Sequence, residues 1–120
     1  MSQALTTPPA VAPPRPWKFP ESTTTATRAG TPVHVFDRPG QYVATVRVTI
    51  AMPLVAERRD LEGVATIMSR TLDEGTELHS ANEFAAALER HGAAYGVDVS
   101  SDALHVEISV PVSQLAPAVT

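Results

Sequence analysis

Prolines crowd the start of this 120-residue chain and exclude regular structure from most of its first quarter. Six of the eleven prolines lie before Glu21, among threonines, and no apolar periodicity runs through them. Proline fixes φ and removes a backbone donor, so such a stretch is expected to be extended and poorly packed. The sequence therefore predicts a disordered Pro/Thr-rich tail over residues 1–28 and one folded domain over residues 29–120.

The only tryptophan of the chain lies in this tail, in the segment Pro16-Trp17-Lys18-Phe19-Pro20. Leaving both Trp17 and Phe19 in water is unfavourable because each ring carries a large apolar surface. We therefore expect the two rings to anchor the tail on a surface, either of this chain or of a partner.

Composition excludes several classes of protein. The chain is 43% hydrophobic and 18% charged, as is ordinary for a globular protein, and no apolar run approaches the roughly 18 residues of a membrane span. It has no cysteine, which excludes disulfides and thiolate metal sites. A net charge of −4 with a single lysine disfavours a nucleic-acid surface. We expect a cytoplasmic protein that binds neither nucleic acid nor membrane.

Two strand signals follow the tail. Residues 42–50 have apolar side chains at all even positions, and their odd positions include Thr45, Arg47 and Thr49, which indicates a strand with one buried face. A short β-branched run, residues 32–36, precedes it. Pro39-Gly40 between the two runs suits a type II turn, so the two strands are predicted to form a hairpin.

Two helices are predicted next. Leu61 and later apolar residues recur at helical spacing, with Asp60 as the expected N-cap and Gly75 as the stop, which predicts a helix over residues 60–74. Ser80-Ala81-Asn82-Glu83 is a capping box, and the helix that it opens should run to His91 and end at Gly92.

The last third of the chain predicts two more strands, at residues 95–99 and 104–110, joined by a turn at residues 100–102. Residues 112–120 resemble the opening of a further helix, so we expect the natural chain to continue. The order β-β-α-α-β-β-(α) predicts an α+β domain, with an antiparallel sheet and helices packed on one face.

No motif in the sequence defines a catalytic site. No two of the four histidines (His34, His79, His91 and His105) have the i, i+4 spacing of helical metal ligands, and structural roles are expected for all of them. The acidic run over residues 73–77 lacks the spacing of a calcium loop and indicates a solvated connection. There is no phosphate-binding glycine loop and no Gly-x-Ser-x-Gly.

One segment nevertheless resembles a known family. Residues 63–76, Gly-Val-Ala-Thr-Ile-Met-Ser-Arg-Thr-Leu-Asp-Glu-Gly-Thr, are similar to the zinc-motif helix of the insulinase/pitrilysin (M16) metallopeptidase family. That helix reads Gly-Leu-Ala-His-Leu-Leu-Glu-His-Met-Leu, then two residues, then Gly-Thr. The resemblance runs from about residue 30 to the end and implies the N-terminal part of a LuxS/M16 metallohydrolase-like half-domain, truncated at its C-terminus.

The resemblance fails at the residues that carry the chemistry. In the family the inverted zinc motif is H-x-x-E-H, with two histidine ligands and a glutamate base. The matching positions here are Thr66, Ser69 and Arg70. Threonine is a poor zinc ligand, serine is no carboxylate base and arginine is permanently cationic. The family's third ligand would lie beyond Thr120. We therefore expect no catalytic residue, metal site or cofactor in this chain.

The resemblance implies a scaffold without its active site. In this family active and degenerate halves commonly pair, on one chain or as a heterodimer, around a peptide-binding chamber. The preferred interpretation is a non-catalytic helper half that pairs with an active zinc-bearing M16 subunit, or with a second half of a longer chain, to bind peptide substrates. Three alternatives remain: an active zinc peptidase with its metal site in a missing C-terminal part, a structural or interaction protein without a proteolytic partner, and an unrelated small α+β binding module.

Overall fold

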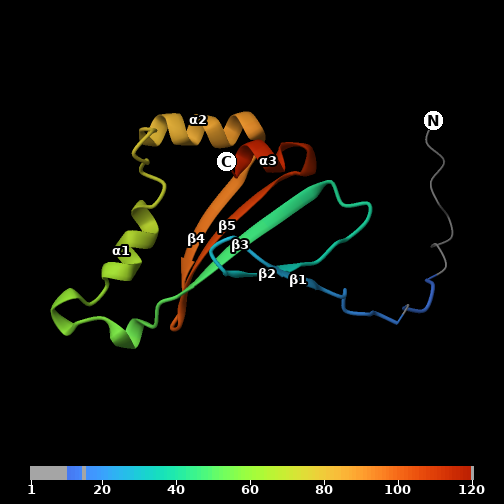
Figure 1. The fold of residues 1–120 in the computed structure, drawn as a ribbon, viewed down its shortest axis with the longest axis horizontal. Coiled ribbons are helices and arrows are strands. Elements are labelled where there is room, and N and C mark those ends of the chain that lie inside the picture. Colours follow the sequence, from blue (N-terminus) through green and yellow to red (C-terminus); the bar gives the residue numbers. More distant parts are fainter. Residues whose placement is uncertain (1–10, 15, 120) are drawn as a thin grey trace. The chain divides into compact units, whose positions relative to one another are not determined.

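The computed structural model describes residues 11–14 and 16–119 of the chain. It divides into two units, residues 1–39 and residues 40–120. Figure 1 shows the elements of both units along the sequence. Each unit is described by itself.

The first unit contains a β-hairpin of strands β1 (Thr23–Ala26) and β2 (Pro32–Val35). The strands pair antiparallel, and Thr24 lies opposite His34, with 3.2 Å between Oγ1 and the ring Nδ1. In the connecting turn the Gly30 N–H donates to the Thr27 carbonyl at 2.9 Å. Gly30 adopts a φ of +86°, which a residue without Cβ accommodates at little cost.

Aromatic rings gather beside this hairpin. Trp17 and Phe19 meet edge to face with 5.4 Å between ring centroids, and Phe19 meets Phe36 in the same way at 6.1 Å. Phe19 is thus in contact with a ring just beyond β2. Trp17 and Phe19 nevertheless remain about 70% exposed, at 71% and 70%. The contact with Phe36 gives the tail an anchor within its own unit.

The pairing of the first strands differs from the prediction. The expected hairpin between residues 32–36 and 42–50 is wrong, because β2 pairs with β1 and the longer strand pairs elsewhere. Strand β1 lies inside residues 1–28, for which no regular structure was predicted. The turn itself exists: Gly40 has the positive φ, +87°, that a type II turn requires.

The second unit is built on an antiparallel sheet with the strand order β3-β5-β4. Its members are β3 (Val43–Ala51), β4 (Ala94–Val99) and β5 (Ala103–Pro111). Strand β5 is central and pairs with β3 along its whole length, from Val43 opposite Pro111 to Ala51 opposite Ala103. The strands closest in sequence, β4 and β5, are joined by the predicted turn at residues 100–102.

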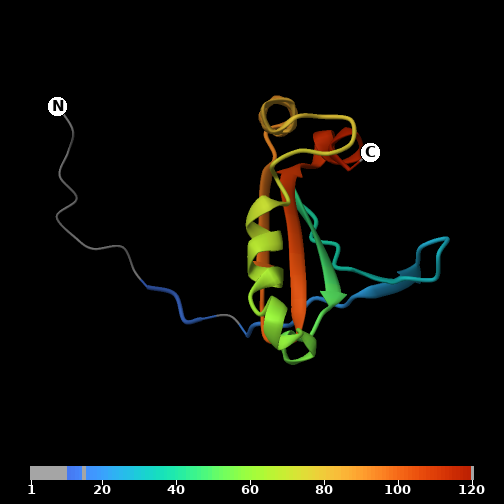
Figure 2. The same cartoon turned by 90° about the vertical axis from the view of Figure 1, so that its left-hand side faces the viewer.

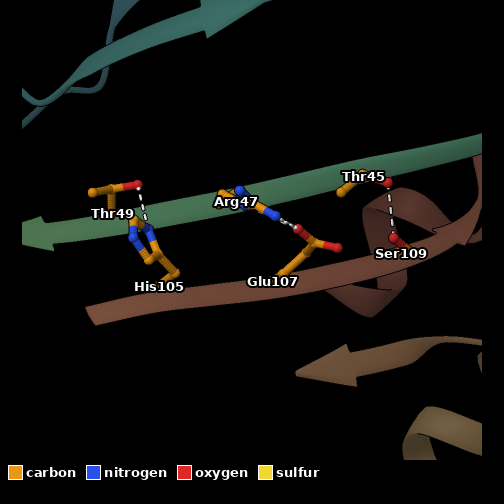
Figure 3. A network of polar contacts seen from close by, with 6 residues as sticks. All are labelled: Thr45, Arg47, Thr49, His105, Glu107 and Ser109. Atoms are coloured by element: carbon orange, nitrogen blue, oxygen red, sulfur yellow. Dashed lines mark hydrogen bonds and ion pairs between the residues drawn. The ribbon is translucent and has the colours of Figure 1, made fainter. Parts of the chain in front are cut away.

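The two faces of this sheet differ sharply. Cross-strand partners of β3 and β5 on one face are all apolar, whereas the other face carries three successive polar pairs, which Figure 3 shows. Arg47 Nε donates to Glu107 at 2.8 Å, and hydroxyls pair Thr45 with Ser109 at 2.8 Å. The apolar face consists of Ala44, Val46, Val48, Ile50, Tyr95, Val97, Val99, Leu104, Val106, Ile108 and Val110.

Helices accompany the sheet at its apolar face. Helix α1 (Val64–Thr71), preceded by 3-10 turns η1 (Leu54–Ala56) and η2 (Arg59–Leu61), runs alongside β4 (Figures 1 and 2). Helix α2 (Ala81–His91) contacts β4 and α3 (Leu115–Ala118), which follows turn η3 (Val112–Gln114). Side chains of α2 and the sheet line an apolar groove of about 270 Å³. In the described part of the chain no helix reaches the length and apolar character of a membrane span.

The fold class and the boundaries of α2 are confirmed. The second unit is α+β with an antiparallel sheet. Helix α2 begins after a complete capping box, in which the Ser80 N–H donates to Glu83 at 2.9 Å and the Glu83 N–H donates back to the Ser80 hydroxyl at 3.4 Å. It ends at Gly92, whose φ is +62°.

Candidate functional site

The candidate site is helix α1, and its first turn is fixed by a side chain from upstream. The Glu57 carboxylate accepts hydrogen bonds from the N–H groups of Gly63 and Ala65, both at 2.9 Å. Such bonds satisfy two of the donors that a helix start leaves free, and they favour the charged carboxylate. They hold the pKa of Glu57 below its usual value.

The predicted cap at Asp60 is wrong. Asp60 lies in turn η2, where its carboxylate pairs with Arg58 at 2.6 Å. Helix α1 starts at Val64 instead, after Gly63 with a φ of +94°. The loop therefore caps the helix through Glu57, six residues before Gly63. Capping rules that examine only the residue next to a helix could not identify it.

The three positions that resemble the family's zinc motif all lie on α1. Thr66 and Arg70 are exposed, one turn apart on a flank of the helix, and Ser69 is half-buried. Ala65, beside Thr66, is 3% exposed and contributes to the core. The Ser69 hydroxyl donates to the Thr66 carbonyl at 2.9 Å.

Thr66, Ser69 and Arg70 differ in chemistry from the ligands and base of a zinc site. Together they present two hydroxyls and a guanidinium, with no imidazole or carboxylate among them, and a permanent positive charge opposes a cation. Among residues 11–14 and 16–119 there is no group of three or more histidine, cysteine, aspartate and glutamate side chains arranged to hold a metal.

The Gly-Thr pair after α1 shapes the loop between the two helices. The helix ends at Thr71, earlier than the predicted stop at Gly75. Gly75 instead forms a β-bridge with Ser80, and a Cβ on it would come within 2.8 Å of the His79 carbonyl oxygen. The Thr76 hydroxyl accepts from the N–H groups of Leu78 and His79 at 3.1 and 3.0 Å. Both residues of the pair thus serve the turn that leads into α2.

Tyr95 connects strand β4 to helix α2. Its ring meets Phe84 of α2 edge to face at 5.5 Å between centroids. Burial, and then the charge of Asp73 just after α1, raise the pKa of the Tyr95 phenol. Because both causes disfavour the phenolate, Tyr95 stays a neutral hydroxyl at physiological pH.

Three of the histidines have polar partners on other segments, away from α1. His34 and His105 contact the Thr24 and Thr49 hydroxyls on neighbouring strands at 3.2 Å. His91, at the end of α2, lies 3.0 Å from the Gln114 amide oxygen and links that helix to the last segment. For His79 the backbone carbonyl accepts from Thr76 at 2.7 Å. The Gln114 partner of His91 was not predicted, because nothing local in the sequence relates residues so far apart.

This combination of features defines a class: an α+β domain in which a helix held at its N-terminus lies beside an antiparallel sheet and is followed by a loop with Gly-Thr. The family comparison agrees. The model for insulinase, peptidase family M16, matches residues 33–120, and the chain belongs to that family. A search of curated proteins gave no match.

Proposed function

We propose that this chain is a non-catalytic M16 homologue, a helper half that pairs with an active zinc peptidase of the same family and contributes wall and substrate contacts to a peptide-binding chamber. The observation that carries the proposal is the combination of a maintained helix α1 with the residues Thr66, Ser69 and Arg70 at its zinc-motif positions. A catalytic half needs two imidazoles and a carboxylate at these positions.

The contacts that hold α1 in place support the view that this chain retains the scaffold of the family. Glu57 fixes the start of the helix, Ala65 is buried, and Gly75 and Thr76 shape its exit. These contacts preserve the position of the helix beside β4. A helper half would need such a helix to complete a chamber, whether or not it binds metal.

Arg70 indicates which peptides a helper half of this kind would bind. Its side chain is exposed in the last turn of α1, and no ion pair or hydrogen bond of its side chain is formed with the part of the chain that the structure describes. A free guanidinium on a chamber wall would favour peptide carboxylates, which it can bind through two parallel hydrogen bonds. Acidic peptides are therefore the substrate class that we expect this half to retain.

Zinc content tests the loss of the metal site. Metal analysis of the purified chain, after dialysis against zinc, is expected to give well below one zinc per chain. The triple variant Thr66→His/Ser69→Glu/Arg70→His restores two of the family's ligands and its base, and it is expected to bind more zinc than the unmodified chain, although less tightly than a site with three protein ligands. The matched variant Thr66→His/Ser69→Glu keeps Arg70 and should bind far less. Stoichiometric zinc on the unmodified chain that is lost on replacing Thr66, Ser69 and Arg70 with alanine would refute the proposal.

Reconstitution tests the helper role. The chain would be co-expressed with an M16 homologue that carries an intact H-x-x-E-H, and hydrolysis of quenched fluorescent peptides would be measured. Hydrolysis is expected to require both chains, and Arg70→Ala should raise KM for an acidic peptide more than for its neutral amide counterpart. Full activity of the partner alone, unchanged by adding this chain, would contradict the role.

A further inference from the structure

Two methionines line one groove beside helix α1. Met52 directly follows strand β3, Met68 lies on α1, and the groove that both of them line has a volume of about 380 Å³ and belongs to the second unit. The chain has no cysteine, so methionine supplies its only oxidisable sulfur atoms. We infer that this pair is a redox-sensitive seat for α1: oxidation to the sulfoxide loosens the helix, and reduction restores it. The inference does not depend on the proposed function.

The fold holds both methionines in place. The Met52 N–H donates to the Asp102 carbonyl at 3.0 Å, which fixes the residue after β3 to the turn between β4 and β5. On α1, Met68 follows Ala65 by three residues, so the two lie on the same side of the helix. Ala65 is 3% exposed and also lines the groove. The two methionines therefore form part of the contact between α1 and the end of β3.

This groove suits a thioether and not a sulfoxide. Its other lining residues are Ala51, Pro53, Ala56, Glu57, Val64 and Ala65. None of the side chains in this described set is a hydrogen-bond donor, since a charged carboxylate only accepts. A sulfoxide is polar, and its oxygen accepts hydrogen bonds. A buried acceptor without a partner is unfavourable, so the oxidised side chain must turn out to water or take an N–H group from the backbone.

Either response loosens the start of α1. The N–H groups of Gly63 and Ala65 already donate to the Glu57 carboxylate, both at 2.9 Å. A sulfoxide oxygen that takes one of them displaces the carboxylate that caps the helix. If the side chain of Met68 turns out to water instead, the helix loses apolar contacts in the groove. The three zinc-motif positions lie on this helix and would move with it.

The oxidation step is balanced when a hydroperoxide is the oxidant. A lone pair of the thioether sulfur attacks one peroxide oxygen, and the S–O bond forms as the O–O bond breaks. With hydrogen peroxide, the proton on the transferred oxygen passes to the departing hydroxide, which leaves as water. Sulfur loses two electrons and the peroxide gains them. Methionine sulfoxide reductases reverse the change, so the seat can be reset.

Hydrogen peroxide treatment followed by hydrogen exchange tests the inference on the full chain. Once mass spectrometry shows that Met52 and Met68 are oxidised, the amides of α1 are expected to exchange roughly tenfold faster, while those of β5 keep their rate. Methionine sulfoxide reductases should restore the slow exchange. Unchanged exchange of α1 in the oxidised chain, or equal acceleration in β5, would overturn the inference. Resistance of both methionines to peroxide that oxidises free methionine would also overturn it.

Two matched substitutions separate the sulfur atoms from the space that they fill. The variant Met52→Leu/Met68→Leu keeps apolar side chains of similar volume that cannot form sulfoxides, so its α1 exchange should not respond to peroxide. It retains every other oxidisable residue, and a response equal to that of the unmodified chain would overturn the inference. Met68→Gln places a polar group of similar length in the groove and should accelerate α1 exchange without peroxide. Unchanged exchange in Met68→Gln would contradict the inference.

Discussion

Glu57 shows how one residue can position a helix from a distance. Its carboxylate accepts from two N–H groups at the start of α1, while Asp60, which the sequence favoured as the cap, pairs with Arg58. The sequence predicted correctly that a helix carries Thr66, Ser69 and Arg70, because apolar spacing marks a helix. It could not predict the cap, because the fold of the loop decides which carboxylate reaches the helix.

Glu57 should make stability depend on pH. The pKa of Glu57 is lowered from the usual 4.5 in the folded state. Its charged carboxylate therefore contributes fully to stability above pH 4.5, and this contribution is lost as the pH falls through the lower pKa of the folded state. The variant Glu57→Gln should have a lower Tm than the unmodified chain at pH 7, and this difference in Tm should shrink as the pH falls toward 3. The control is Glu62→Gln, at an exposed glutamate of the same loop. A gap that is constant across this pH range would contradict the assignment.

At the level of elements, local signals placed both ends of α2 but neither end of α1, and the long-range pairing of the strands was not predicted. The capping box and Gly92 placed both ends of α2, since each signal acts within a few residues. Pro39-Gly40 correctly predicted a turn, yet the strands on either side pair with different partners. Strand β3 alternates apolar and polar residues in register with β5, and this match of two faces outweighs proximity in sequence. Strand β1, Thr-Thr-Thr-Ala, has no apolar alternation to reveal it.

The capping box of α2 gives a prediction at this scale. Ser80→Ala removes the hydroxyl that accepts from the Glu83 N–H and is expected to destabilise the chain by about 1 kcal/mol. For a folded region of this size that corresponds to a fall in Tm of roughly 4–8 °C. Thermal unfolding followed by circular dichroism would measure it. Ser101→Ala, at an exposed turn position, is the matched control, and an equal effect of both variants would count against the cap.

At the scale of the whole molecule, the two units differ in the number and kind of contacts that stabilise them. The first depends on a hairpin of two four-residue strands with an aromatic group beside it. The second has a central strand, β5, bonded on both sides, and the buried residues Ala65, Ala103, Leu104 and Val110. An isolated two-stranded hairpin is at best marginally stable in water.

Hydrogen exchange should resolve this difference. The amides of β5 are expected to be the most protected of the chain, and those of β1 and β2 to exchange orders of magnitude faster, because opening a hairpin disrupts little packing. Exchange measured by mass spectrometry on peptides from both regions would show it, with the exposed residues 37–41 as the fast reference. Protection of β1 and β2 equal to that of β5 would show that the hairpin unfolds only together with the sheet.

The pairing of β3 with β5 has a consequence during synthesis of the chain. Arg47 and Glu107, which meet across these strands, are 60 residues apart in sequence. At ribosomal rates of roughly 5–20 residues per second, β3 emerges several seconds before its partner exists. Throughout that interval the nascent polypeptide carries an apolar, valine-rich segment whose partner strand β5 has not yet been synthesised.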